Sequence, residues 1–363
     1  MFGAALPWWA AHGLDRAHGG YVEQMTLDGH DAAVPFKRTR VTARQIYVFS
    51  HAYMLGFDKG ADLARHGVDF LIAKTWLGPD RGFARRLTSK GDLLDPTPDL
   101  YDLAFVLFAF SWFYKASGDR TAHDWLHRTL DFVESHLRHP QEGFLHEVPP
   151  KGFRQQNPHM HLTEACLAAF EATGEKRFGD LAKELAGLFQ RRFFDLKSQT
   201  LAEYFNDDWS RAPAPDGRIT EPGHQFEWAW ILNSCRKLLD LDLAAQIRAA
   251  IAFAEKHGVD SADCITFNQV RDDGVPIDKG SRTWPNTERI KAAIALHELD
   301  GVDPSAVVRS SAGLLLDRYL AHTPHGTWID SFDAAGKPVV NSIPASTLYH
   351  VFLAFAEVLR VSD

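Results

Sequence analysis

The segment Glu221-Pro-Gly-His-Gln-Phe-Glu-Trp-Ala-Trp230 places side chains suited to proton transfer at the start of a predicted helix. Pro222 suits the first turn of a helix, and an apolar run follows it. His224 and Glu227 are three residues apart, so they share one face of that turn. An imidazole beside a carboxylate, near the positive end of a helix dipole, can exchange protons. The same pair can also be a histidine of the capping region with a partner glutamate.

Similar ionisable residues stand near the start of five other predicted helices, each otherwise apolar. Successive members of the set are about 60 residues apart, the length of an internal repeat. The six are Arg44, Asp102, His161, His224, Glu288 and His350. Taken singly, Arg44 could pair with a core carboxylate, Asp102 could cap its helix, and His161 could be a satisfied core histidine. Because burying charge without purpose is costly, six in register predict one shared functional pocket.

Twelve helices would position these residues. Apolar periodicity predicts them near 3–13, 41–57, 60–76, 99–118, 120–137, 159–173, 176–193, 223–240, 243–258, 284–299, 303–321 and 343–361. Short turns follow the even-numbered helices and long loops follow the odd-numbered ones. The even-numbered helices are more apolar on all sides, which predicts that they are the inner helices.

Six such hairpins closed into a ring give an all-α (α/α)6 barrel, a single catalytic domain over residues 1–363. The long loops contain short extended segments, with Gly29 and Gly336 at hairpin-turn positions. We therefore expect short β-hairpins in the long loops, gathered on one face with the N-terminal ends of the inner helices.

The composition narrows the function classes. The 363 residues carry a net charge of −8 and are 45% hydrophobic, with no basic stripe, which argues against nucleic acid and anionic membranes. The three scattered cysteines favour a reducing compartment. The N-terminus lacks the basic region of a signal peptide, and the apolar runs are too short to span a bilayer. We expect a soluble cytoplasmic protein.

The polar set predicts proton abstraction beside a carbonyl. Neutral histidines such as His224 and His350 are good general acids and bases. Arg44 could hold a developing enolate-type oxygen, and Glu227 could orient or polarise His224. The sequence contains no convincing metal-ligand spacing, no Gly-rich phosphate loop and no nucleophile elbow, so no metal and no cofactor are expected.

These residues resemble the N-acylglucosamine 2-epimerase superfamily over essentially the full chain. The matching segments are Val41-Thr-Ala-Arg-Gln-Ile-Tyr47, Tyr101-Asp-Leu-Ala-Phe105, Asn157-Pro-His-Met-His-Leu-Thr-Glu164, Pro222-Gly-His-Gln-Phe-Glu-Trp228, Trp284-Pro-Asn-Thr-Glu288 and Ser346-Thr-Leu-Tyr-His350. The segment 41–50 is most similar to the D-mannose and sulfoquinovose isomerase branch. The chain is shorter than most members, and Trp-Pro-Asn-Thr-Glu departs from the Trp-Pro-Gln piece of some branches.

The resemblance implies an (α/α)6 barrel and a role for each matching residue. His224 and His350 look like the catalytic acid/base pair, and Arg44 resembles the arginine that binds substrate oxygens near C1 and C2. The other expected substrate-binding residues are Asn157, His161, Glu227, Asp102, Glu288, Trp284 and Trp328. A capping role for Asn157 and packing roles for the two tryptophans are the alternatives.

The function expected from this resemblance is a cofactor-free aldose–ketose isomerase that interconverts D-mannose and D-fructose through a cis-enediol. A sugar 2-epimerase needs nearly the same residues and is the alternative. A glycoside hydrolase, which needs two carboxylates flanking the scissile bond, and a helical scaffold are more distant alternatives. The expected partner is a monosaccharide, with no nucleic acid and no membrane, and a homodimer is compatible with the sequence.

Overall fold

The computed structural model describes residues 1–362, which fold into two compact units, each built from three segments of the chain. Unit 1 comprises Met1–Gly152, His161–Ala182 and Ser342–Tyr349, and unit 2 comprises Phe153–Met160, Lys183–Asn341 and His350–Asp363. Three helices, α6, α7 and α12, run from one unit into the other. The expectation of a single domain over 1–363 stays a prediction.

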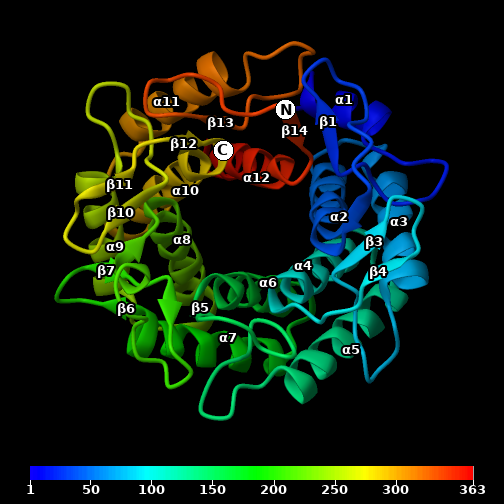
Figure 1. Cartoon of the computed structure of the whole chain (residues 1–363), viewed down its shortest axis with the longest axis horizontal. Coiled ribbons are helices and arrows are strands. Elements are labelled where there is room, and N and C mark those ends of the chain that lie inside the picture. The colour runs from blue at the N-terminus through cyan, green and yellow to red at the C-terminus, as the bar shows by residue number, and fades with distance from the viewer. Residues whose placement is uncertain (363) are drawn as a thin grey trace. The chain divides into compact units, whose positions relative to one another are not determined.

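Unit 1 is built on helical hairpins, in which α2 packs against α3 and α4, and α4 packs against α5 (Figure 1). Its helices are α1 (Ala5–His12), α2 (Thr39–Met54), α3 (Gly60–Phe70), α4 (Leu100–Ser117), α5 (Arg120–His136), most of α6 (Asn157–Thr173) and the start of α7 (Lys176–Leu188). Strands β2 (Phe36–Arg38), β3 (Arg86–Thr88) and β4 (Leu93–Asp95) form one antiparallel sheet, and β1 (Gln24–Thr26) pairs with β14 (Ser342–Pro344).

Unit 2 repeats the same packing, with α8 against α9 and α10, and α10 against α11. Its helices are α8 (Pro222–Leu239), α9 (Ala244–Gly258), α10 (Thr283–Asp300), α11 (Ser305–Leu314) and most of α12 (Thr347–Ser362). Its strands are β5 (Arg154–Gln155), β6 (Phe194–Asp195), β7 (Thr200–Leu201), β8 (Tyr204–Phe205), β9 (Ile219–Thr220), β10 (Gln269–Arg271), β11 (Pro276–Asp278), β12 (Ser281–Arg282) and β13 (Ser331–Phe332). They pair as β5 with β8, β6 with β7, β12 with β13, and β9–β10–β11.

All twelve predicted helices are present, most within a few residues of their expected ends. The largest difference at the start of a helix is at α12, because residues 342–344 pair with β1 as a strand and the helix begins only at Thr347. Three outer helices, α3, α7 and α11, end in a five-residue π turn, at Leu71–Thr75, Phe189–Phe193 and Leu315–Tyr319.

The even-numbered helices are buried along most of their length, as predicted. In α4, every residue from Leu103 to Ser111 is buried, whereas α5 is amphipathic. Gly118 ends α4 and Gly301 ends α10 with positive φ angles of 68° and 72°, a backbone conformation that glycine adopts without strain. Gly29 and Gly336 also have positive φ and close tight turns, as expected.

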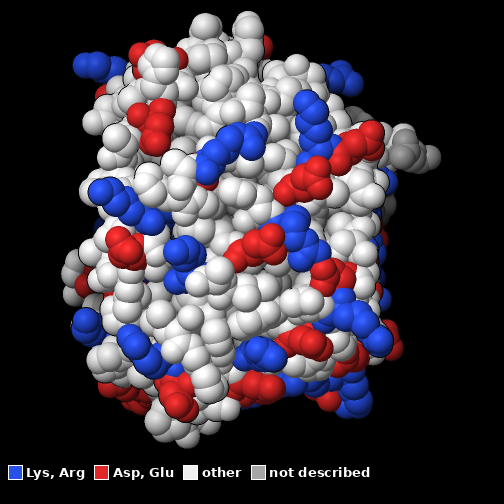
Figure 2. Space-filling view, turned by 90° about the vertical axis from the view of Figure 1, so that its right-hand side faces the viewer, with Lys and Arg blue, Asp and Glu red and all other residues white. Residues whose placement is uncertain are grey.

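Two of the expected local hairpins are confirmed in β3–β4 and β10–β11, whereas β1 pairs with β14 from the far end of the sequence. Within residues 1–362, no helix combines the length and the apolar character needed to cross a lipid bilayer. On the face shown in Figure 2, basic and acidic side chains alternate without a large patch of either sign.

Candidate active site

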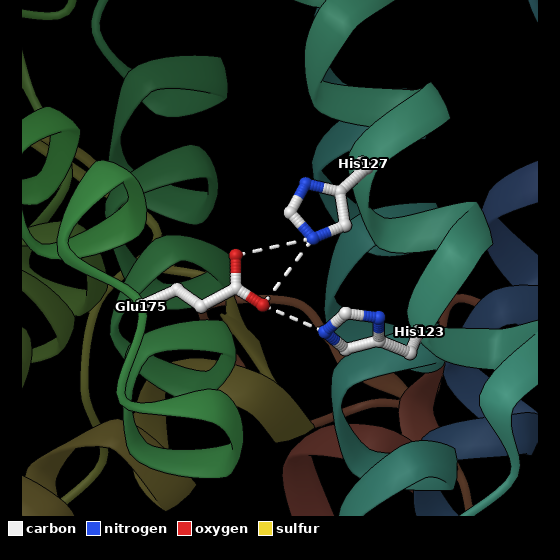
Figure 3. Close-up of side chains that lie close together, drawn as sticks. All are labelled: His123, His127 and Glu175. Carbon is white, nitrogen blue, oxygen red and sulfur yellow. Dashed lines mark hydrogen bonds and ion pairs between the residues drawn. The ribbon is translucent and has the colours of Figure 1, made fainter.

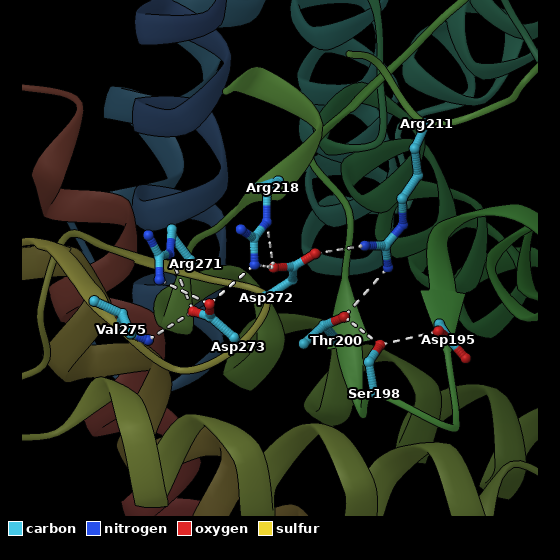
Figure 4. A network of polar contacts seen from close by, with 9 residues as sticks. All are labelled: Asp195, Ser198, Thr200, Arg211, Arg218, Arg271, Asp272, Asp273 and Val275. Carbon is cyan, nitrogen blue, oxygen red and sulfur yellow. Dashed lines mark hydrogen bonds and ion pairs between the residues drawn. The ribbon is translucent and has the colours of Figure 1, made fainter. Parts of the chain in front are cut away.

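The first turn of α8 is held in place by the sheet that precedes it. Strand β9 pairs with β10 and leads directly into Glu221 and the helix, with Pro222 in the first turn. Beside this sheet, the Arg218 guanidinium donates to Asp272 at 2.9 and 2.7 Å, within the polar network of Figure 4. Because this network fixes the chain entering α8, it sets the position of His224.

His224 is buried and is held by two carboxylates. Its Nδ1 lies 3.0 Å from Oε2 of Glu203 and 3.8 Å from Oε2 of Glu221. Glu203 is itself fixed, since it accepts hydrogen bonds from the Gln156 amide at 2.8 Å and the Glu221 backbone N–H at 3.1 Å. Burial alone would lower the pKa of His224, but the charges of Glu203 and Glu221 outweigh burial and raise it to about 9.

One expectation for His224 was wrong. It was expected to be neutral, but with this pKa it is an imidazolium at neutral pH. Glu227 was expected to orient or polarise His224; Glu203 is the residue at 3.0 Å from Nδ1, and the charge of Glu227 contributes to the raised pKa. Glu203 lies in the short link between β7 and β8. No periodicity in the sequence relates this link to the start of α8, so the contact with His224 could not be predicted.

His350, on α12, is another buried histidine of unit 2, and it is also held at Nδ1 by a carboxylate. Glu288 Oε1 lies 2.9 Å from this nitrogen, and Glu288 Oε2 lies 2.5 Å from Nζ of Lys291. Glu288 and Lys291 are fully buried, and Nζ lies 4.2 Å from the ring centre of Trp230. Oxygens of Glu227 and Glu288 and a ring nitrogen of His350 lie within 4.8 Å of one another. The lysine ammonium thus supplies positive charge to this acidic cluster.

The indole of Trp284 adjoins both histidines. Its ring centre is 5.0 Å from that of His224 and 5.7 Å from that of His350. The structure therefore brings together His224, His350, Glu227, Glu288 and Trp284 in unit 2, and three of them, His224, Glu288 and His350, belong to the set spaced by about 60 residues. Trp328 is buried in the segment that leads to β13.

In unit 1, Arg44 is buried in an aromatic cage. Its guanidinium donates to the Tyr101 hydroxyl at 2.6 Å and the Ser346 carbonyl at 3.4 Å. The guanidinium carbon also lies 4.2 Å from the ring centre of Phe105 and 5.0 Å from that of Tyr349. Among residues 1–362 Arg44 has no carboxylate partner, so the ion pair with a core carboxylate considered above is not formed. An arginine without such a partner can bind an anionic or enediol oxygen of a ligand.

His161 packs on the same aromatic side chains. Its ring centre is 4.9 Å from that of Tyr101 and 4.6 Å from that of Phe105. Its Nδ1 lies 3.1 Å from Oε2 of Glu164, and that carboxylate accepts the Tyr349 hydroxyl at 2.8 Å. His161 in unit 1, like His224 and His350 in unit 2, is thus held at Nδ1 by a glutamate.

Asp102 and Asn157 do not cap their helices. The cap of α4 is Asp99, whose carboxylate accepts the Asp102 backbone N–H, while the buried Asp102 carboxylate faces Arg40 at 3.5 Å. Burial raises the pKa of Asp102 to about 7, against the opposing charge of Arg40. Asn157 is the first residue of α6, and within the described chain its Oδ1 accepts no hydrogen bond.

Comparison with known proteins gives consistent results. Residues 19–354 match the model of the N-acylglucosamine 2-epimerase family. A mannose-6-phosphate isomerase of Rhizobium meliloti is 35% identical over 98% of this chain and 93% of its own length. A D-mannose isomerase of Thermobifida fusca is 27% identical over 90% of this chain and 86% of its own. A crystal structure of a D-mannose isomerase superposes with a TM-score of 0.90 at 24% identity, covering 98% of this chain and 95% of that one.

The fold is an (α/α)6 barrel, as predicted, and the protein is an enzyme of the sugar isomerase and epimerase class. The chain belongs to the N-acylglucosamine 2-epimerase family, whose model matches more than nine-tenths of its length. This membership agrees with the resemblance seen in the sequence.

Proposed function

We propose that this enzyme interconverts D-mannose and D-fructose by proton transfer between histidines and the sugar. The observation that carries the proposal is the pair of buried histidines, His224 and His350, each held at Nδ1 by a glutamate and each beside the indole of Trp284. Such a hydrogen bond fixes the ring orientation and directs Nε2 to the substrate. The indole offers an apolar face for the sugar ring.

The two histidines differ in their charge partners, and we assign them different first steps. His224, an imidazolium at neutral pH, donates its proton to the ring oxygen; the C1–O5 bond breaks, C1=O forms, and the C1 hydroxyl proton passes back to His224. His350 removes the proton from C2; the C2–H electron pair forms the C1=C2 bond and the C1=O π pair moves to the C1 oxygen, which gives the cis-enediolate. Arg44 donates hydrogen bonds to the oxygens on C1 and C2, where this negative charge develops. The C2 hydroxyl proton then moves to the C1 oxygen, C2=O forms, and the C1=C2 π pair takes the proton back from His350 at C1, which gives the ketose.

The remaining predicted residues complete the proposed sugar site. His161, Asn157 and Asp102 contact hydroxyl groups, Glu227 and Glu288 set the charge around the catalytic pair, and Trp284 and Trp328 line the sugar. We propose that the enzyme works in the cytoplasm on a free monosaccharide without a cofactor. The relative named a mannose-6-phosphate isomerase makes a C6-phosphorylated mannose the first analogue to compare.

A 2-epimerase is the second candidate, because the same two histidines beside Trp284 could also return the proton to C2. If the histidine on the opposite face returns the proton to C2, the enediol becomes the C2 epimer instead of a ketose. The family model that matches this chain is that of a 2-epimerase.

The deciding experiment is proton NMR of D-mannose incubated with the pure protein in D2O with EDTA. Fructose as product supports the isomerase, whereas glucose carrying deuterium at C2 shifts the proposal to the epimerase. If neither forms, the same assay with mannose 6-phosphate, sulfoquinovose, N-acetylglucosamine and cellobiose tests the substrate. The variants H224N and H350N should lose nearly all activity, and H136N, on the exposed end of α5, should keep it. Full activity in H350N would refute the proton-transfer scheme.

A further inference from the structure

Two histidines and a glutamate meet on the surface of unit 1, outside the proposed sugar site (Figure 3). His123 and His127 lie one turn apart on α5, and their Nε2 atoms both point at the carboxylate of Glu175. The distances are 2.6 Å from His123 to Oε1, and 3.3 and 3.1 Å from His127 to Oε1 and Oε2. Three potential ligand atoms therefore converge on one point.

Two elements, α5 and the turn between α6 and α7, hold the three side chains, and all three are partly exposed to solvent. Histidines at i and i+4 share one helix face, the spacing used by helical zinc sites. Glu175 lies in the turn between α6 and α7, where its backbone N–H donates to Thr173 Oγ1 at 3.1 Å. The side chains of His123, His127 and Glu175 are 31%, 29% and 34% exposed, so a fourth position on an ion would face water.

The distances are close to those of a tetrahedral ion site. Zinc–nitrogen and zinc–oxygen bonds of about 2.0–2.2 Å at the tetrahedral angle place neighbouring ligand atoms about 3.3 Å apart. The two contacts of His127 already have that length. Of the histidine–glutamate contacts, that of His123 must lengthen, by about 0.7 Å, which a rotation of the partly exposed Glu175 side chain can supply.

The charges around the cluster suit a bound cation with one exception. Glu175 supplies a carboxylate ligand to the two imidazoles, a donor set that suits a divalent cation. The exception is Arg177, which donates to Nδ1 of His127 at 3.0 Å. An imidazole bound to metal through Nε2 carries its proton on Nδ1 and needs an acceptor there, so Arg177 must withdraw. After it withdraws, the Arg177 guanidinium can remain bound to Asp131 and Glu134, to which it already donates at 2.7 Å and 3.0 Å.

We propose that His123, His127 and Glu175 form a binding site for zinc or a similar divalent transition metal, linking α5 to the α6–α7 turn. The site serves stability and not the sugar chemistry. The sequence did not reveal it because the third ligand is 48 residues after His127, in a turn with no helical spacing to the histidines.

Zinc titration calorimetry on the chelator-treated full chain tests this proposal. Wild type should bind one zinc per chain, and its melting temperature should rise with zinc concentration. H127A and E175Q should each weaken binding at least tenfold, whereas H136A, a histidine of the same helix outside the cluster, should bind as wild type. Circular dichroism checks that each variant is folded.

The Arg177 contact provides a variant that should gain affinity. R177Q replaces a donor by a side chain that can accept the Nδ1 proton, so zinc should bind about tenfold tighter. R128Q, which removes an arginine of α5, is the matched control and should leave the zinc affinity unchanged. Zinc binding that survives H127A, or that is absent in wild type and R177Q alike, would overturn the proposal. Activity in EDTA should be unchanged, so this outcome is separate from that of the isomerase assay.

Discussion

The hydrogen bond between Glu203 and His224 is expected to set the upper pH limit of activity. The pKa of His224, about 9, lies well above its ordinary value of 6.5, which corresponds to roughly 3 kcal/mol in favour of the imidazolium. Burial opposes this and Glu203, at 3.0 Å, is the largest of the favourable charges. E203Q keeps an oxygen acceptor but removes the charge. The pKa of His224 should then fall by roughly 2 pH units, to near or below 7.

The assay is kcat/KM for mannose between pH 6 and 10, since this quantity reports the ionisation of the free enzyme. In wild type the rate should decline above about pH 9, when His224 loses the proton it donates. In E203Q the decline should begin roughly 2 pH units lower. NMR titration of the imidazole signals measures the same ionisation even if activity is lost.

The matched control is E221Q, because Glu221 lies farther from Nδ1, at 3.8 Å. It should move the decline by less than E203Q does. The stability of the fold should also fall as the pH rises and His224 loses its proton. A raised histidine pKa stabilises the fold fully below pH 6.5, and this stability is lost as the pH rises through about 9. If the His224 midpoint in E203Q equals that of wild type, the assignment of Glu203 as the partner that keeps His224 charged is refuted.

Three further changes test other parts of the site. K291M leaves buried Glu288 without its ammonium partner, so unfolding in urea should show a loss of about 3–5 kcal/mol, and the acidic limb of kcat/KM should move to higher pH; an unchanged profile would exclude a charge-balancing role. D102N should flatten the pH dependence of stability, because the raised Asp102 pKa, about 7, makes the wild-type fold lose roughly 2–3 kcal/mol of stability as the pH rises from 5 to 7; parallel curves for the two proteins would contradict this. R44K keeps the charge but loses the planar stacking on Phe105 and Tyr349, so steady-state kcat/KM should fall about 100-fold, and a loss below tenfold would argue against Arg44 as the oxygen ligand.

The inner helices were predictable because their signal is local. Each is apolar on all sides and carries one polar position about 60 residues after the last, so periodicity alone revealed His224, Glu288 and His350. Lys291 carried a similar signal, a lysine three residues after Glu288 inside a buried helix, but it was not included in the predicted site.

Glu203 could not be found in this way. It lies between two two-residue strands, and its contact with His224 depends on how the loop folds over the start of α8. The protonation state of His224 was missed for the same reason, since it depends on Glu203 and Glu221 together. The residue types of a site are thus easier to predict from sequence than their charge states, which depend on long-range contacts.

The two histidine–glutamate pairs of unit 2 are built alike but compensated differently. Both glutamates approach Nδ1 at about 3 Å, yet Glu203 is joined by a second carboxylate, Glu221, whereas Glu288 shares its charge with Lys291. Glu203 and Glu221 together favour the protonated form of His224. At His350, the ammonium of Lys291 offsets the charge of Glu288 and weakens that preference. Under the proposed mechanism this difference suits His224 to the role of acid and His350 to that of base, although each has a glutamate as its hydrogen-bond partner at Nδ1. This asymmetry is what an enediol reaction needs, because ring opening requires a proton donor before C2 can lose its proton to a base.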